Sequence, residues 1–404
     1  MESRAKQYLI VTSCYWAFTL TDGALRMLMV LYFHNLSYSP LEIASIFLLY
    51  EFFGIVTNLL GGWFAAKKGL DFTLKAGLLL QILALCMLLL PPSLLHIAYV
   101  MLAQALSGIA KDLSKMSAKS SIKKLIPDNE QNKLYSWIAW LTGSKNTLKG
   151  AGFFLGAALF SIVEFRGTLL FLIGIMTVAL ALSTFLNKDT SPSKFTAKFN
   201  TILSKSSRIN TLSAARFFLF GSRDIWFVVA LPVYLQEALS WTHVQVGSFM
   251  AIWIITYGII QSFSPTITRT LSKLRSTNYS HQPNGSSAYL WCLPVVVITL
   301  TLCSIGMLYE LSSTIIVLGL ILFGVFFAIN SSIHSYLIVS YASEESVSLD
   351  VGFYYMANAA GRLIGTILSG LLYQQYGLTA CLAASACFMM SAALISTRLP
   401  KSNL

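Results

Sequence analysis

Charged residues are scarce in this chain: Asp, Glu, Lys and Arg together make up 11% of its 404 residues. Soluble globular domains usually carry about 25% charged residues. Hydrophobic residues make up 56% of the chain, far more than the surface of a soluble protein of several domains tolerates. The composition therefore excludes that class and indicates a membrane protein.

Sequence motifs that carry enzymatic or metal chemistry are also missing. The six cysteines form no Cys-x-x-Cys pair, which argues against a disulfide framework and against a zinc site. No phosphate-binding loop of the Gly-x-x-x-x-Gly-Lys-Ser/Thr type occurs, and no His-Glu-x-x-His helix or nucleophile elbow occurs either. We therefore expect no enzymatic activity, no cofactor and no bound metal.

Apolar stretches of membrane-spanning length recur twelve times along the chain. A spanning helix needs roughly 20 apolar residues. The stretches are residues 8–33, 41–66, 74–90, 95–117, 134–160, 168–187, 211–236, 243–268, 289–308, 312–341, 350–373 and 378–397. Two glycine pairs, Gly152/Gly156 and Gly361/Gly365, predict close approach between helices. We expect an all-α membrane protein with twelve transmembrane helices.

One long polar segment, residues 188–210, interrupts this pattern near the middle of the chain. It predicts a six-helix bundle over residues 1–187, a cytoplasmic linker and a second bundle over residues 211–404. Residues 36–44 and 239–247 resemble each other, and Asp22 and Asp224 precede them at matching positions. A parallel repeat of two six-helix units is the arrangement of the major facilitator fold, in which the substrate is held where the halves meet.

The excess of 28 Lys and Arg over 16 Asp and Glu gives the chain a net charge of +12. In the connections that follow odd-numbered stretches, Arg166 is the one basic residue, and the other connections and both termini hold many. Because basic residues stay on the cytoplasmic side, both termini are predicted to be cytoplasmic, in a multi-pass protein of the cell inner membrane. The basic residues are scattered and lack an aromatic platform, so we expect the lipid bilayer and no nucleic acid as a partner.

Placing an ionisable residue inside the bilayer costs free energy, so each such residue is expected to have a charged partner, contact with water or a role in function. The interiors of the third, sixth, ninth and twelfth stretches hold none, which predicts that these four face lipid. The predicted substrate-binding residues are the eight basic ones: Arg26, Lys111, Lys115, Lys145, Lys149, Arg216, Arg223 and Arg362. The candidates for proton coupling or ion pairing are the four acidic ones: Asp22, Glu51, Asp112 and Asp224.

The spacing of the lysines favours an anionic ligand. Lys111 and Lys115 share one helix face, and so do Lys145 and Lys149, so like charges are stacked where they repel each other. The planar guanidinium of arginine can form two parallel hydrogen bonds to a phosphate or carboxylate group, whereas the lysine ammonium acts as a point charge. We expect a cavity for a small polyanion. Its polar cavity candidates are Asn146, Asn330, His334 and Asn358.

Structural roles are the alternatives for several of these residues. Lys111 and Lys115 lie near the inner end of their stretch, where their heads can reach the membrane surface. Glu51 has no basic neighbour on its own helix, so it either pairs with a lysine or carries a proton. His334 can also be explained as an interior histidine that is hydrogen-bonded and has no role in ligand binding. Two pairs are also explained as purely structural: Asp22–Arg26 and Arg223–Asp224.

Several segments resemble known transporter families. Residues 61–69 (GGWFAAKKG) resemble the Gly-x-x-x-Asp-Arg/Lys-x-Gly signature of major facilitator transporters, with Ala66 where the family usually has Asp. A closer resemblance, to the organoarsenical efflux permease ArsJ family, is carried by YWAFTLTDGALRM (15–27), YEFFGIVTNLLGGW (50–63), AQALSGIAKDLSKMSAKS (103–120) and LTGSKNTLKGAGFFLG (141–156).

The resemblance to ArsJ implies a substrate. That family is understood to export 1-arseno-3-phosphoglycerate, which glyceraldehyde-3-phosphate dehydrogenase forms when it uses arsenate in place of phosphate. The expected function is secondary active efflux by alternating access. It would confer arsenate resistance together with the dehydrogenase, a functional partner with no physical contact implied. The alternative is a major facilitator transporter of another small organic phosphate or carboxylate.

Overall fold

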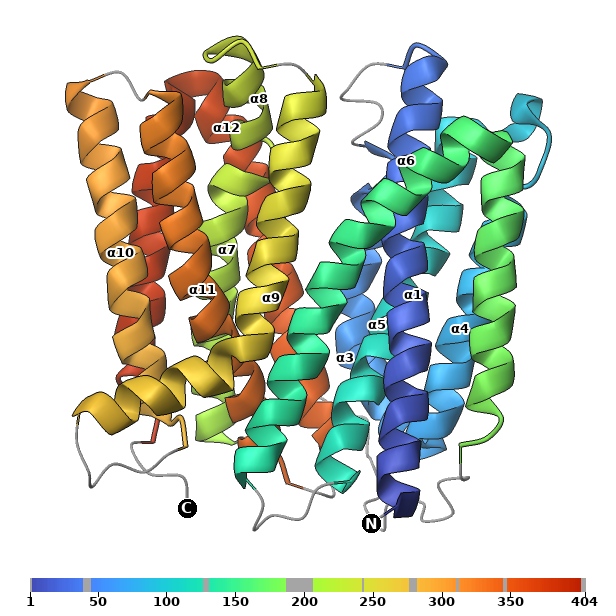
Figure 1. The fold of residues 1–404 in the computed structure, drawn as a ribbon, viewed down its shortest axis with the longest axis horizontal. Coiled ribbons are helices and arrows are strands. Elements are labelled where there is room, and N and C mark those ends of the chain that lie inside the picture. Colours follow the sequence, from blue (N-terminus) through green and yellow to red (C-terminus); the bar gives the residue numbers. More distant parts are fainter. Residues whose placement is uncertain are drawn as a thin grey trace. The chain divides into compact units, whose positions relative to one another are not determined.

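The computed structural model describes residues 2–38, 45–125, 131–186, 206–241, 243–275, 282–309, 312–343 and 347–400, and these residues form helices and short connections. The α-helices are α1 (Glu2–Asn35), α3 (Leu48–Lys68), α4 (Leu70–Met87), α5 (Ile97–Leu125), α6 (Gln131–Ser183), α7 (Ser207–Phe227), α8 (Ala230–Glu237), α9 (His243–Arg275), α10 (Gly285–Leu308), α11 (Ser313–Tyr341) and α12 (Val347–Ser396) (Figure 1). A short 3-10 turn, η1, covers Pro92–Leu94.

In the described part of the chain, seven helices are long and apolar enough to cross a membrane. Two of them, α6 and α12, have 53 and 50 residues, which is enough for two passes each. Each is broken once by a residue with positive φ, Glu164 at 58° and Gly377 at 74°. A described helix lies in each of the twelve stretches expected from the sequence. The number of twelve membrane crossings, however, stays a prediction.

The chain forms two compact units. The first comprises Met1–Asp128, Ser144–Ser204 and Ala342–Met356, and the second comprises Asn129–Gly143, Lys205–Tyr341 and Ala357–Leu404. Helices α6 and α12 therefore each contribute to both units. Residues 187–205 lie outside the described residues, so the linker at 188–210 and the boundaries of the two predicted bundles stay predictions.

Both units contain the same unusual turn. Ser37 follows α1 with φ 63°, and Ser240 follows α8 with φ 53°. The next residues, Tyr38 and Trp241, donate their N–H groups to backbone carbonyls of the preceding helix at 3.1 and 2.9 Å. A positive φ is uncommon for serine, so its occurrence at two matching positions supports the internal repeat.

Glycines let helix backbones approach closely in each unit. In the first unit, a Cβ added to Gly152 of α6 would lie 2.5 Å from the carbonyl oxygen of Leu20 in α1. In the second unit, a Cβ on Gly365 of α12 would lie 2.7 Å from the carbonyl oxygen of Gly221 in α7. The close packing that the glycine pairs predict is therefore confirmed at both positions.

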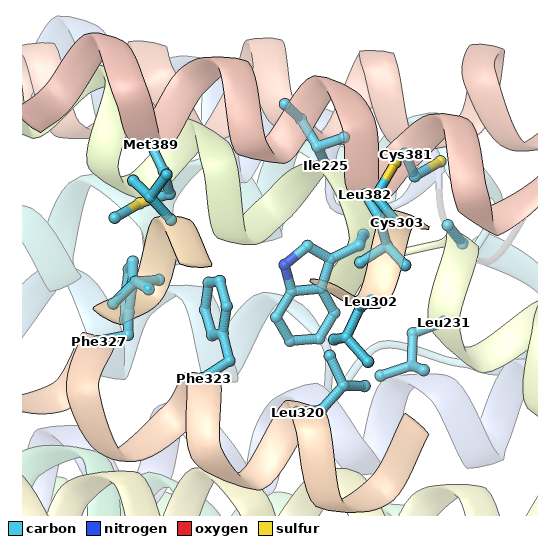
Figure 2. Close-up of a cluster of buried hydrophobic side chains, with 14 of the residues drawn as sticks. Ile225, Leu231, Leu302, Cys303, Leu320, Phe323, Phe327, Cys381, Leu382 and Met389 are labelled. Carbon is cyan, nitrogen blue, oxygen red and sulfur yellow. The ribbon is translucent and has the colours of Figure 1, made fainter. Parts of the chain in front are cut away.

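The core of the second unit is a cluster of buried hydrophobic side chains that includes Phe323 and Phe327 (Figure 2). The indole of Trp226 is fully buried in this cluster. Its ring centroid lies 5.0 Å from that of Phe323 in α11 and 6.1 Å from that of Trp253 in α9. Trp253 in turn donates to the carbonyl oxygen of Leu320 at 2.9 Å. These contacts fix α7, α9 and α11 against one another and position the charged residues of α7.

Large apolar side chains are exposed on the four stretches predicted to face lipid. Examples are Leu79 of α4, Leu170 of α6, Val297 of α10 and Leu394 of α12, each more than half exposed. Such surfaces are unfavourable in water and favourable in hydrocarbon. Similar side chains are exposed on other stretches too, such as Leu102 of α5 and Leu318 of α11, so which stretches face lipid stays a prediction.

Candidate functional site

In the first unit, Asp22 of α1 is buried and pairs with a base from α6. The Lys149 ammonium lies 3.5 Å from Asp22 Oδ2, and the Tyr50 hydroxyl donates to Asp22 Oδ1 at 2.6 Å. The close crossing of α1 and α6 brings these helices together, because a Cβ on Gly23 would lie 2.6 Å from the Lys149 carbonyl oxygen. The contacts of Asp22 thus join three helices, α1, α3 and α6.

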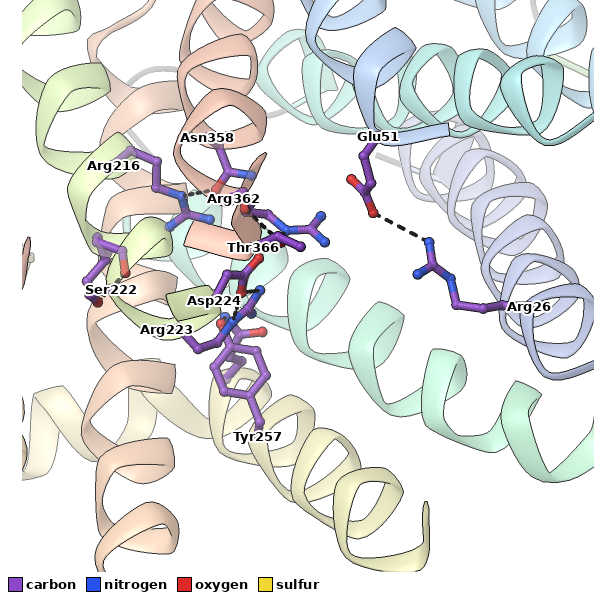
Figure 3. Close-up of polar contacts among 12 residues, drawn as sticks. Arg26, Glu51, Arg216, Ser222, Arg223, Asp224, Tyr257, Asn358, Arg362 and Thr366 are labelled. Carbon is purple, nitrogen blue, oxygen red and sulfur yellow. Dashed lines mark hydrogen bonds and ion pairs between the residues drawn. The ribbon is translucent and has the colours of Figure 1, made fainter. Parts of the chain in front are cut away.

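Arg26, one turn after Asp22, pairs with Glu51 of α3 at 3.4 Å, as Figure 3 shows. Its guanidinium also lies 4.7 Å from the ring centroid of Phe47 and 4.9 Å from that of Tyr50. Both charged groups keep about a quarter of their surface exposed. They are therefore accessible to a ligand, whereas Asp22 is not.

A second group of charges in the first unit lies on α5. Asp112 is buried, and the ammonium groups of Lys115 and Lys111 lie 2.5 and 3.7 Å from its carboxylate oxygens. The glycine opposite, Gly54 of α3, leaves room for this carboxylate, since a Cβ there would lie 3.0 Å from Asp112 Oδ2. Lys111 also lies 3.9 Å from the Tyr50 ring centroid, next to the groups around Asp22.

In the second unit, Asp224 of α7 is fully buried between two arginines (Figure 3). Arg223 Nε donates to Asp224 Oδ1 at 2.6 Å, and Arg362 Nε of α12 donates to Oδ2 at 2.9 Å. One carboxylate thus binds two guanidinium groups, one of which, Arg362, is nearly a third exposed. The pair of arginines keeps a net positive charge that an anionic ligand can meet.

Arg216, two turns before Arg223 on α7, is almost completely buried. Its Nε donates to Asn358 Oδ1 of α12 at 2.9 Å, and its NH1 group donates to the carbonyl and hydroxyl oxygens of Ser331 in α11 at 3.2 and 3.1 Å. Its guanidinium carbon lies 3.8 Å from the ring centroid of Phe220. The three oxygen atoms that accept from Arg216 in these contacts are all neutral.

The remaining predicted residues take different places. Asn330 is buried and donates to the Ala288 carbonyl oxygen at 3.2 Å and to the Cys292 sulfur at 2.8 Å, both on α10. His334 is fully buried, and neither of its ring nitrogens has a hydrogen-bond partner within the described residues. Lys145 and Asn146 are half-buried on α6, in the first unit.

The structure decides some of the pairings that the sequence left open. Asp22 has Lys149 and Tyr50 as its closest partners, rather than its helix neighbour Arg26. Glu51 pairs with Arg26 at 3.4 Å, and its role as a lysine partner or a proton carrier stays a prediction. Arg223 does pair with Asp224, as one alternative held.

Sequence reasoning missed two kinds of residue at these sites. The first kind is aromatic: the rings of Tyr50, Tyr355 and Phe220 form cation–π contacts with lysine or arginine side chains. An aromatic residue in an apolar helix does not by itself indicate such a contact. Lys119 lies beyond the predicted end of its stretch at residue 117, yet it is 2% exposed. Lys119 follows Lys111 and Lys115 at four-residue spacing, and this regular spacing could have indicated that it lies on the same helix face.

No group of three or more His, Cys, Asp or Glu side chains suited to a metal ion occurs among the described residues. What the two charged clusters share is a surplus of bases over acids. In the second unit, Arg223 and Arg362 both pair with the carboxylate of Asp224, and α7 also carries Arg216. Such an arrangement can bind and release an anion electrostatically, and it contains no nucleophile activated by a base.

The family follows from a comparison with known protein families. The model of the Major Facilitator Superfamily matches residues 11–280, about two thirds of the chain. The chain belongs to the major facilitator superfamily. It is therefore a multi-pass membrane protein and a transporter rather than an enzyme. No curated protein sequence matches the chain.

Solved structures of major facilitator transporters share the fold. A variant of the E. coli fucose:proton symporter FucP matches with a TM-score of 0.72 and 10% identity, over 96% of this chain and 97% of the other. The human organic anion transporter MFSD10 matches with a TM-score of 0.71 and 14% identity, over 96% and 98%. A bacterial homologue of the iron transporter ferroportin, in an outward-facing state with soaked iron, matches with a TM-score of 0.72 and 16% identity, over 98% of both chains.

Proposed function

We propose that this major facilitator transporter exports a small organic anion from the cytoplasm across the cell inner membrane by alternating access. The observation that carries the proposal is the single carboxylate of Asp224 between Arg223 and Arg362, in a unit that also buries Arg216. Placing three arginines at membrane depth is costly in free energy, and an anion bound beside them would lower that cost. The N–H groups of a guanidinium match the spacing of two phosphate or carboxylate oxygens.

The same surplus of basic over acidic residues disfavours a cationic substrate. Although a ferroportin homologue shares the fold, a metal cation would meet repulsion from the arginines around Asp224. The human relative by fold is described as an organic anion transporter, which agrees with the charge argument. The proposal needs no metal ion and no cofactor.

The resemblance of the N-terminal segments to the ArsJ family supports 1-arseno-3-phosphoglycerate as the substrate. This molecule carries two anionic ends on a three-carbon body. In the proposed mechanism Lys145, Lys149, Arg223 and Arg362 bind the anionic groups, and Arg26, Lys111, Lys115 and Arg216 are secondary contacts. Asp22 or Glu51 is the proposed proton carrier if transport is coupled to protons. The second candidate is another small organic phosphate or carboxylate, since both clusters bind charge rather than arsenic.

Arsenate resistance tests the substrate. The gene is expressed in an arsenate-sensitive host, with and without glyceraldehyde-3-phosphate dehydrogenase, and growth is measured against arsenate concentration. We expect resistance when both proteins are present and none with either alone. Resistance without the dehydrogenase contradicts this substrate. Counterflow of labelled glycerol phosphate in proteoliposomes then tests the second candidate.

The binding role of Arg362 is tested by Arg362→Gln beside a matched control, Lys75→Gln. Lys75 forms a half-buried i,i+4 pair with Asp71 at 2.9 Å and belongs to neither cluster. Loss of a charged hydrogen bond costs about 1.5–3 kcal/mol, so we expect KM to rise about tenfold to a hundredfold. The control should keep the wild-type KM. An unchanged KM in Arg362→Gln, with normal expression, contradicts the assignment.

A further inference from the structure

Tyr50, near the start of α3, contacts charged side chains from two other helices of the first unit. The residue is 2% exposed, so its ring and hydroxyl are enclosed by protein. The hydroxyl donates to Asp22 Oδ1 of α1 at 2.6 Å. Two positive groups lie against the ring: the Lys111 ammonium of α5 is 3.9 Å from its centroid, and the guanidinium carbon of Arg26 of α1 is 4.9 Å from it. One neutral side chain thus contacts an acid and two bases.

Helix packing fixes the position of this ring. A Cβ added to Gly108 of α5 would lie 2.6 Å from the Tyr50 carbonyl oxygen and 3.1 Å from its Cα atom, so the two backbones touch there. Lys111 follows Gly108 by three residues and lies on the same face of α5. Asp22 and Arg26 share a face of α1 in the same way. The hydroxyl and the ring of one tyrosine are therefore contacted by neighbouring residues of a single helix face on α1.

These contacts restrain two side chains that are flexible on their own. A cation is attracted to the negative face of an aromatic ring, and more strongly where water is excluded. The hydrogen bond from the tyrosine hydroxyl to the Asp22 carboxylate is charge-assisted and of typical length, and it restrains the ring in turn. Long basic side chains lose much rotamer freedom when they are ordered. Ordering them before a ligand arrives reduces the cost of binding.

The two bases keep contact with solvent, whereas the ring does not. The side chain of Arg26 is 27% exposed and that of Lys111 is 19% exposed. Their carboxylate partners, Glu51 at 3.4 Å and Asp112 at 3.7 Å, lie farther away than in the strongest charged hydrogen bonds. A ligand can therefore reach the positive groups but not Tyr50 itself.

We propose that Tyr50 is a positioning residue for anion binding. Its ring holds the cationic groups of Arg26 and Lys111 in place for a small organic anion with phosphate or carboxylate groups. Its hydroxyl, bound to Asp22, holds the ring. Tyr50 does not touch the anion and acts through the two bases. This inference rests on the proposed function and adds to it the residue that prepares part of the binding site.

The test measures the affinity of the purified full-length protein in detergent for 3-phosphoglycerate or glycerol phosphate by isothermal titration. Tyr50→Leu removes the ring and the hydroxyl, and Tyr50→Phe keeps the ring. Loss of two cation–π contacts is expected to raise Kd at least about tenfold in Tyr50→Leu. Tyr50→Phe should stay within about threefold of the wild-type Kd, since the ring remains. An unchanged Kd in Tyr50→Leu, or equal losses in both variants, overturns the proposal.

Tyr135 of α6 provides the matched control. It is fully buried, its hydroxyl oxygen lies 2.8 Å from Ser264 Oγ, and its ring centroid lies 5.0 Å from that of Tyr336, so these neighbours are neutral. Tyr135→Leu should lower Tm as Tyr50→Leu does and keep the wild-type Kd. A rise in Kd of the same size in both overturns the proposal, because it would follow from the loss of any buried ring. If Tyr50→Leu does not fold, Tyr50→Met fills more of the space and replaces it.

A double-mutant cycle separates positioning from structural damage. Lys111→Gln removes one of the two cations that the ring contacts. If Tyr50 acts through this cation, Tyr50→Leu raises Kd by a smaller factor in the Lys111→Gln protein than in the wild type. Equal factors in the two backgrounds overturn the role assigned to the ring.

The failure of this inference differs from the failure of the proposed function. A wild-type protein that binds neither 3-phosphoglycerate nor glycerol phosphate, and moves neither in proteoliposomes, contradicts the proposed function and this inference with it. A wild-type protein that binds and moves one of them, with Kd unchanged in Tyr50→Leu, keeps the proposed function and loses only the role of Tyr50.

Discussion

Asp224 is the residue on which the charge balance of the second unit depends. Its carboxylate accepts from Arg223 at 2.6 Å and from Arg362 at 2.9 Å, and its surface is fully buried. In a low-dielectric interior, removal of one partner leaves the others with uncompensated charge. The carboxylate therefore serves stability as well as any binding of substrate by the two arginines.

Asp224→Asn is expected to destabilise the protein by about 3 kcal/mol, the cost typical of breaking a buried ion pair. Thermal unfolding in detergent measures the effect as a drop in Tm of several degrees. Lys75→Gln is the comparison, because its half-buried i,i+4 pair with Asp71 stays in contact with solvent and contributes about 1 kcal/mol. Equal Tm values for the two variants would show that Asp224 is not a structural counter-charge.

The sequence predicted which residues are charged at depth but not how they pair. The i,i+4 spacing of Asp22 and Arg26 favoured a pair within α1, whereas Lys149 and Tyr50 are the closest partners of Asp22. Pairing between helices depends on how each helix is rotated about its axis. That rotation is set by packing, and the spacing along one helix does not contain it.

At the scale of helices, the glycine patterns were the sequence signals that the structure confirmed most directly. Gly23, Gly152 and Gly156 lie where α1 and α6 cross, and Gly221, Gly361 and Gly365 lie where α7 and α12 cross. The ends and breaks of helices were less predictable. α5 continues to Leu125, beyond the predicted end at 117, which explains why Lys119 lies on a buried helical face rather than in a loop.

Gly152→Ala is expected to loosen the crossing of α1 and α6. The new Cβ would lie 2.5 Å from the backbone oxygen of Leu20, which cannot move without shifting α1. Overpacking of this kind typically costs about 1–3 kcal/mol. Gly174→Ala, on the same helix with nothing within 4 Å of the added Cβ, should instead stabilise by up to about 1 kcal/mol. Thermal unfolding of both variants gives the comparison, and a Tm change of the same sign in both would contradict the predicted crossing.

At the scale of the whole chain, the two units are not two consecutive halves. Residues 129–143 of the first predicted bundle belong to the second unit, and residues 342–356 of the second bundle belong to the first. Composition divides a chain at its polar segment, whereas compact units follow contacts, and α6 and α12 each contribute residues to both units. The internal repeat was nonetheless visible in sequence, at the segments that contain Ser37 and Ser240.

The orientation of the chain in the membrane is a prediction of its charge distribution that labelling can test. Ser93 in η1 and Asn132 at the start of α6 are both exposed, and they lie in connections predicted to be external and cytoplasmic. Neither position is basic, so a substitution there leaves the charge signal intact. After Cys86 and Cys387, the two exposed thiols, are replaced by serine, a membrane-impermeant maleimide is applied to intact spheroplasts. Ser93→Cys should label directly and Asn132→Cys only after permeabilisation, because basic connections are retained inside. The reverse order would place both termini outside the cell and contradict the predicted orientation.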